Sequence, residues 1–223
     1  MMTGHIAVGM MAKRLHPQIS LGTAVFAALW ADFVAFVLLI ARVERFDPVP
    51  GASLNRMIGR NIVFSHSLLM DALWAGLFAG IFFLRRRSPR GAWILFAAVV
   101  SHWVLDVASH RPDMPLAPGT STRLGLGLWN SMPTALIVEG ALWLLAIIIY
   151  LRATFSKKSW AIYGFWIPVI LVTLIWRANI SAGMDLNPTR AGIGGIVLFS
   201  LVVAWAYWMN RLRPPVKGRR RCE

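Results

Sequence analysis

The stretch MPTALIVEGALWLLAIIIYL, residues 132–151, decides the fold class. It is twenty residues long and carries one charged side chain, Glu139. A helix of about 20 apolar residues crosses the hydrocarbon core of a bilayer. The stretch therefore predicts a transmembrane helix.

The remainder of the chain has the same character. Hydrophobic residues make up 57% of the 223 residues and charged residues 14%, with a mean hydropathy of +0.62. A soluble protein has too few polar residues at this composition to cover its core, which excludes a soluble enzyme, a disulfide scaffold and a disordered chain. Five more stretches have the length and apolar character of membrane spans: 19–41, 63–84, 92–109, 160–179 and 192–211.

These stretches predict an all-α, polytopic integral membrane bundle of about six transmembrane helices. The first residues, MMTGHIAVGMMAKRL, are too short to span and do not resemble a signal peptide, so we expect a short N-terminal interfacial or half-inserted helix capped by Thr3. Residues 1–223 form one predicted domain, with a metal-site half at about 4–152, two further spans at about 160–211 and a basic tail at 212–223.

The net charge of +14 is attributed to topology and to contact with membrane lipids, and we expect no nucleic-acid partner. With the N-terminus inside, 15 of the 23 Lys and Arg residues fall on the cytoplasmic side. This bias predicts that both termini are cytoplasmic. The single cysteine, Cys222, excludes an internal disulfide and a thiolate metal cluster.

Ionisable side chains inside the spans point to a site, because each costs several kcal/mol in a membrane unless it has a partner or a role. The third span contains SHWVLDVASH, in which His102, Asp106 and His110 are spaced i, i+4 and i+8 on one helical face. An imidazole and a carboxylate at this spacing suit zinc, manganese or iron. For this motif alone, a buried ion pair or an interhelical hydrogen bond is the alternative interpretation.

Depth in the membrane favours the metal. In the six-span topology Asp32, His66, His102, Asp106 and Glu139 all lie within roughly 15 Å of the outer interface, at ~1.5 Å per residue. We therefore predict a divalent metal, zinc first and manganese or iron as alternatives, bound by Asp32, His66, His102 and Asp106. Two other histidines are candidate ligands: His110 at the end of the third span, and His5 if the N-terminal segment inserts into the bundle.

Other polar residues receive subsidiary roles. Ser65 and Ser67 flank His66 and are expected to cap its helix or hydrogen-bond to it. Asp71 lies about 140 degrees round the helix from His66 and is expected to face another neighbour. Glu139 is the candidate general base, and Arg111 the candidate contact for a substrate anion. The loop 110–131 is otherwise an ordered connector rich in proline and glycine.

The residues GHIAVGMMAKR, Asp32, FSHSLL, SHWVLDVASHRPDMPL and GLGLWNS resemble the bacterial membrane-bound metal-dependent hydrolases of the YdjM-like family. The resemblance covers most of residues 4–152. It implies a bacterial inner membrane location and a site that includes His5, Asp32, His66, His102 and Asp106. The order of these residues is also similar, more weakly, to the ligand order of zinc-dependent phospholipase C.

We therefore expect a membrane-embedded hydrolase whose substrate is a lipid or lipid-linked ester or phosphoester. Two other functions remain open: a transporter or channel that uses the buried acids and histidines as an ion or proton path, and a non-catalytic membrane scaffold. The sequence gives neither the substrate nor the oligomeric state.

Overall fold

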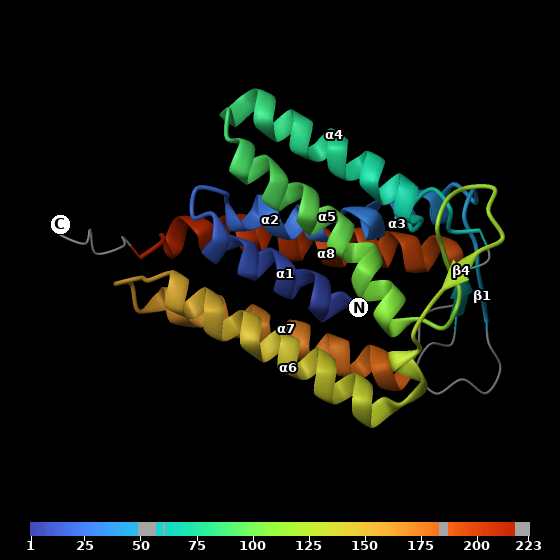
Figure 1. The fold of residues 1–223 in the computed structure, drawn as a ribbon. Helices are drawn as coiled ribbons and strands as arrows, with labels where there is room; N and C mark the ends of the chain where they lie inside the picture. The colour runs from blue at the N-terminus through green and yellow to red at the C-terminus, as the bar shows by residue number, and fades with distance from the viewer. Residues whose placement is uncertain (49–56, 60, 183–186, 217–223) are drawn as a thin grey trace.

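The computed structural model describes residues 1–48, 57–59, 61–182 and 187–216. Most of the predicted basic tail, including Cys222, lies outside these residues. The described chain is a bundle of eight α-helices (Figure 1): α1 Met2–Leu15, α2 Leu21–Ala28, α3 Trp30–Ile40, α4 Leu68–Arg86, α5 Pro89–Ser109, α6 Met132–Ala153, α7 Trp160–Ala182 and α8 Pro188–Leu212.

The predicted polytopic helical membrane fold is confirmed. Helices α4, α5, α6, α7 and α8 are long and apolar enough to cross a bilayer, and α2 with α3 makes a sixth crossing if the bent pair counts as one span. Large apolar side chains on these helices point outward; the following are more than half exposed: Leu73, Leu84, Ile137, Leu174 and Leu201. Such a surface suits contact with lipid and not with water.

Two predicted spans need correction. The stretch 19–41 is not one straight helix, because it bends by 54° between α2 and α3. The third span begins earlier than residue 92: Pro89 occupies its first turn and Ser88 caps it by accepting a hydrogen bond from the Gly91 backbone N–H. Proline is well placed at that position, since it has no N–H to leave unpaired.

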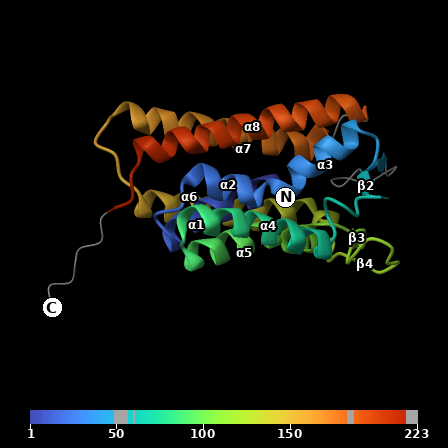
Figure 2. The same cartoon turned by 90° about the horizontal axis from the view of Figure 1, so that it is seen from above.

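The short strands gather at the end of the bundle opposite the C-terminus (Figures 1 and 2). Strands β1 (Phe46–Pro48) and β2 (Met57–Gly59) form one antiparallel pair, and β3 (Met114–Pro115) and β4 (Arg123–Leu124) form another. A single 3₁₀ turn, η1 (Leu128–Asn130), leads into α6.

Helix α1 lies inside the bundle, between α5 and α6 in Figure 1. Ile6 and Met10 are fully buried in the main apolar core, which also includes Tyr150 and Phe165. The half-inserted alternative therefore describes α1, and an interfacial position does not. The predicted cap is wrong as well: Thr3 lies within the helix, and its hydroxyl donates a hydrogen bond to Glu139 on α6.

Gly9 allows α1 to reach this depth. A Cβ at this position would lie 2.6 Å from the Cα of Val25 on α2, which is closer than packed side chains approach a backbone. The two backbones are therefore in contact at Gly9. This contact fixes how far His5, one turn earlier on α1, extends toward the centre of the bundle.

Candidate metal centre

Five ionisable side chains from four parts of the chain meet in the bundle: His5 on α1, Asp32 in the first turn of α3, His66 just before α4, and His102 and Asp106 on α5. Two sets of three have ligand atoms within 4.8 Å of one another: His5, Asp32 and His102, and His66, His102 and Asp106. The structure thus brings together the four predicted ligands and His5.

The four His-to-Asp distances among the predicted ligands are close to those around a small tetrahedral ion. His66 Nε2 lies 3.7 Å from Asp32 Oδ1 and 3.6 Å from Asp106 Oδ2. His102 Nε2 lies 3.7 Å from Asp32 Oδ1 and 3.3 Å from Asp106 Oδ2. A tetrahedron with zinc-to-ligand distances of about 2.1 Å has edges of about 3.4 Å. The four measured edges come within about 0.3 Å of that value.

The ring of His66 is oriented by a chain of two hydrogen bonds. Ser65 Oγ donates to Glu44 Oε2 at 2.5 Å, and the same oxygen lies 2.7 Å from His66 Nδ1. Because its proton is directed at the carboxylate, the hydroxyl accepts from Nδ1–H. His66 therefore carries a proton on Nδ1, and in the neutral ring its Nε2 lone pair points toward Asp32 and Asp106.

The ring of His102 is also oriented through its Nδ1 atom, in this case by a backbone carbonyl group. Its Nδ1 lies 2.9 Å from the carbonyl oxygen of Ala28, which can only accept a hydrogen bond. Nδ1 therefore carries a proton, and Nε2, which is buried and has no hydrogen-bond partner among the described residues, faces the carboxylates. Partners of this kind on the distal nitrogen are usual for metal-ligating histidines.

With both rings neutral, two nitrogen lone pairs face two carboxylates at 3.3–3.7 Å; with both rings protonated, the same contacts are buried ion pairs. Lone pairs and negative charge repel at this range, and burial makes the repulsion stronger. A cation held among the four atoms turns each repulsion into an attraction. The donor set of two imidazoles and two carboxylates, with His5 beside them, could hold a divalent metal.

His5 completes the cluster from the side of α1. Its Nε2 lies 3.1 Å from Asp106 Oδ1, and its ring stacks on that of His102 with the centroids 3.6 Å apart. The amino group of Met1 lies 2.9 Å from the same Asp106 oxygen. His5 therefore meets the condition stated for it, because α1 inserts into the bundle and brings it to the site.

The cluster is open at Asp32. The side chain of Asp32 is 21% exposed, whereas those of His66, His102 and Asp106 are exposed by 6% or less. A substrate or water molecule that reaches a metal here has to arrive along the α3 side.

Two predicted residues lie elsewhere. His110 ends α5 with its Nδ1 3.2 Å from Asp113 Oδ1 and its ring against Trp129, and neither ligand set includes it. Arg111 follows directly and is partly exposed; its backbone carbonyl accepts from the Asp113 N–H. Its role as an anion contact stays a prediction.

Glu139 lies next to α1 and outside both ligand sets. Its Oε1 accepts from the indole of Trp129 at 2.6 Å, and its Oε2 accepts from the indole of Trp176 at 2.9 Å and from Thr3 Oγ1 at 3.3 Å. The carboxylate therefore links α1, α6, α7 and the turn before α6. Its predicted role as a base stays untested.

Sequence reasoning missed Glu44, which is fully buried and accepts the backbone N–H groups of Phe64 and Ser65 in addition to the Ser65 hydroxyl. Its place in a loop after a span gave no signal. The two predicted roles of the serines are confirmed, one for each residue: Ser65 bonds His66, and Ser67 caps α4 by accepting from the Met70 N–H.

Asp71 is fully buried, and neither of its carboxylate oxygens has a hydrogen-bond partner among the described residues.

No curated protein and no solved structure matches the chain. The family described as YdjM inner membrane protein matches residues 1–184, a range that contains every residue of the cluster. The chain belongs to the YdjM inner membrane protein family.

Proposed function

We propose that this inner membrane protein is a metal-dependent hydrolase that acts on a lipid or a lipid-linked ester or phosphoester. The observation that carries the proposal is the fixed orientation of His66 and His102. Their Nδ1 atoms are engaged by Ser65 and by the Ala28 carbonyl, so in the neutral rings both Nε2 atoms are free to bind a metal together with the carboxylates 3.3–3.7 Å away. Asp32, His66, His102 and Asp106 would hold the metal, with His5 as a further ligand.

When bound, a divalent metal polarises a phosphoryl or acyl oxygen and makes a water molecule more acidic. The protein supplies the other requirements. Apolar helices exclude bulk water, which strengthens the interactions within the site. The exposed side of Asp32 leaves an approach from α3, and the outward-facing apolar surface of the helices suits a substrate that diffuses within the bilayer.

Two buried carboxylates outside the ligand sets are candidate proton acceptors. Glu139 already accepts three hydrogen bonds, which stabilise its charge and occupy both oxygens. Asp71, in the first turn of α4, is fully buried, and neither of its carboxylate oxygens has a hydrogen-bond partner among the described residues. We assign the acceptor role to Asp71 and a positioning role to Glu139.

Variants that remove the negative charge but keep the shape of the side chain distinguish the two roles. Asp71→Asn should keep the metal and lose hydrolysis, because a positioned base contributes about 10² to 10⁴ in rate. Glu139→Gln should lower thermal stability and reduce hydrolysis less. If Glu139→Gln abolishes turnover with metal and stability unchanged, the assignments are exchanged.

The packing of α5 supports a local site in preference to a path through the membrane. The face that carries His102 and Asp106 continues toward the start of the helix as Val99, Ala98 and Leu95, all of them buried and apolar. A conduit for ions or protons requires polar groups or water along that half as well.

The proposal is tested by metal analysis of detergent-purified protein together with mass spectrometry of lipids incubated with it. The wild type should hold metal and convert a lipid ester or phosphoester, and His102→Ala should do neither. His16→Ser is the matched control, because His16 lies at the end of α1 and bonds Ser88 instead of the cluster. Ion or proton flux from the wild type in proteoliposomes, with every lipid unchanged, would refute hydrolysis.

A further inference from the structure

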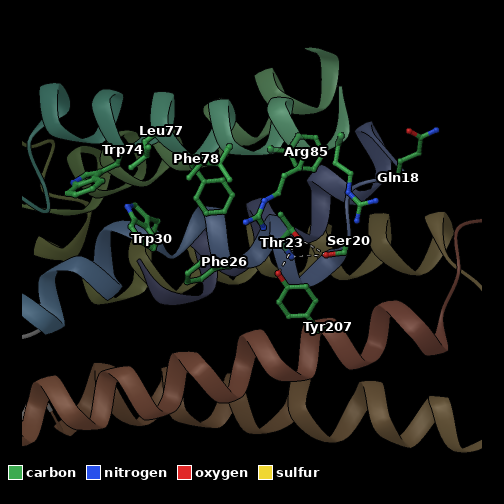
Figure 3. Close-up of a pocket in the computed structure, with 13 residues that line it drawn as sticks. Gln18, Ser20, Thr23, Phe26, Trp30, Trp74, Leu77, Phe78, Arg85 and Tyr207 are labelled. Carbon is green, nitrogen blue, oxygen red and sulfur yellow. Dashed lines mark hydrogen bonds between the residues drawn. The ribbon is translucent and has the colours of Figure 1, made fainter. Parts of the chain in front are cut away.

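A cavity of about 570 Å³ runs along α4 from Trp74 to Arg86, at the end of that helix away from His66. It is lined by α2, α4, the start of α3 and Tyr207 of α8 (Figure 3). None of the five cluster residues lines it. We propose that this cavity is a binding site for one anionic phospholipid, with the phosphate at Arg85 and Arg86 and an acyl chain along the aromatic wall.

The two ends of the cavity differ in chemistry. At one end are Arg85 and Arg86, in the last turn of α4, together with Gln18. Both arginines are exposed, and no described acidic residue lines the cavity or forms a salt bridge with either of them. Guanidinium groups bind phosphate through paired N–H donors. This end therefore has the charge and the geometry to hold a phosphate.

Hydroxyl groups extend the polar end inward. Ser20 Oγ lies 2.7 Å from Thr23 Oγ1, which lies 3.2 Å from the Tyr207 hydroxyl. Figure 3 shows these three side chains beside Arg85. Tyr207 can take this position because residue 22 is glycine, where a Cβ would overlap the tyrosine ring. These three hydroxyl groups can donate hydrogen bonds to the ester oxygens that lie between the phosphate of a lipid and its acyl chains.

The other end is apolar and closed by aromatic rings. Phe26, Trp30 and Phe78 contact one another with centroids 5.3–6.2 Å apart, and Trp30 meets Trp74 at 5.9 Å. From Trp74 to Arg86 the helix rises about 18 Å. Half of the hydrocarbon core is about 15 Å thick, so the cavity has the length of one acyl chain in one leaflet.

This lipid is distinct from the hydrolase substrate. His66 and Arg85 are separated by the length of α4, about 28 Å, so the phosphate and glycerol esters of a lipid bound at Arg85 stay far from the cluster. The bound lipid is a resident one that fills the space between α4 and α8. The inference does not depend on the proposed hydrolysis.

The test compares two lipids with identical chains, phosphatidylglycerol and phosphatidylcholine, by native mass spectrometry of the detergent-purified protein. We expect the wild type to retain the anionic lipid preferentially. Two interfacial arginines contribute an affinity factor of roughly 10- to 30-fold, which Arg85→Gln with Arg86→Gln should remove. Arg152→Gln with Lys157→Gln removes the same charge from the α6–α7 end and should leave the preference intact.

Two further variants test whether the lipid occupies this cavity. Leu77→Trp fills the apolar part of the cavity and should lower retention of both lipids, and His102→Ala should change neither. The proposal is overturned by equal retention of the two lipids by the wild type or by a preference that survives the double arginine variant. It is also overturned if glycerol phosphate, which has no acyl chain, competes as well as the lipid, since this would indicate an ion site alone.

Discussion

The hydrogen-bond chain from Glu44 through Ser65 to His66 yields a prediction with a built-in control. The nearby Ser67 caps α4, whereas Ser65 bonds His66. Ser65→Ala removes the oxygen that lies 2.7 Å from His66 Nδ1 and 2.5 Å from Glu44 Oε2. The imidazole then loses the partner that fixes its tautomer and its orientation. Zinc binding should weaken without any change in the ligands themselves.

The size of the effect follows from the contacts. Loss of a partner that orients a ligand lowers metal affinity by about 10- to 100-fold, or about 1.4 to 2.7 kcal/mol. Ser65→Ala should fall within this range, because Glu44 Oε1 keeps its backbone donors from Phe64 and Ser65 and the loop therefore stays in place.

Glu44→Gln should be as damaging, although it preserves shape. The backbone N–H groups of Phe64 and Ser65 require the amide oxygen, so the amide nitrogen takes the position that faces Ser65 Oγ. The amide donates to the hydroxyl, whose proton then turns toward His66 Nδ1. This reversal favours the tautomer with a proton on Nε2, so the nitrogen that faces Asp32 and Asp106 has no lone pair for a metal.

Ser67→Ala is the matched control. Ser67 caps α4 and does not contact the His66 ring, so its loss should cost about 1 kcal/mol of stability and leave metal affinity unchanged. Zinc affinity is measured by competition with a chelator in detergent, and stability by thermal melting of the same samples. Equal zinc affinities for the wild type, Ser65→Ala and Glu44→Gln would refute the orienting role, and absence of zinc binding by the wild type would refute the metal site.

Three further predictions concern α1 and its contacts. Gly9→Ala should lower the melting temperature and the bound metal together, since its Cβ meets the Val25 backbone, whereas Gly76→Ala, with open space around it, should be neutral or slightly stabilising on thermal melting. Glu139→Gln should cost about 1 to 3 kcal/mol in stability, because an amide nitrogen would face an N–H or O–H donor; unchanged melting would contradict this. His5→Ala should weaken zinc binding in chelator competition without abolishing it, and no change in affinity would remove His5 from the ligands.

Local patterns in the sequence predicted much of this structure. Runs of apolar residues located the long helices to within a few residues, because crossing a bilayer imposes a minimum length. The spacing of His102 and Asp106 placed both on one face of α5, and the shared depth of Asp32 and His66 correctly brought them to the same place. Each of these inferences needs only helical geometry and the membrane thickness.

The sequence did not reveal contacts that depend on tertiary packing. Whether α1 lies at the interface or within the bundle depends on the fit of Gly9 against Val25, which no periodicity encodes. Glu44 meets Ser65 only because the intervening chain turns back through β1 and β2. A buried carboxylate in a loop has no spacing signature, so it was invisible before the fold was known.

The break between α2 and α3 was equally hidden, since the segment LGTAVFAALWADF has neither proline nor glycine near Leu29, yet the site depends on it. At the end of a helix the last carbonyl groups lack intrahelical donors, which leaves Ala28 O available to His102 Nδ1. The same break starts a new helix whose first turn contains Asp32, where the helix dipole favours a negative charge. A straight helix through 19–41 would occupy the Ala28 carbonyl and lose this placement of Asp32. The bend therefore positions both Asp32, a candidate metal ligand, and the carbonyl group that orients His102.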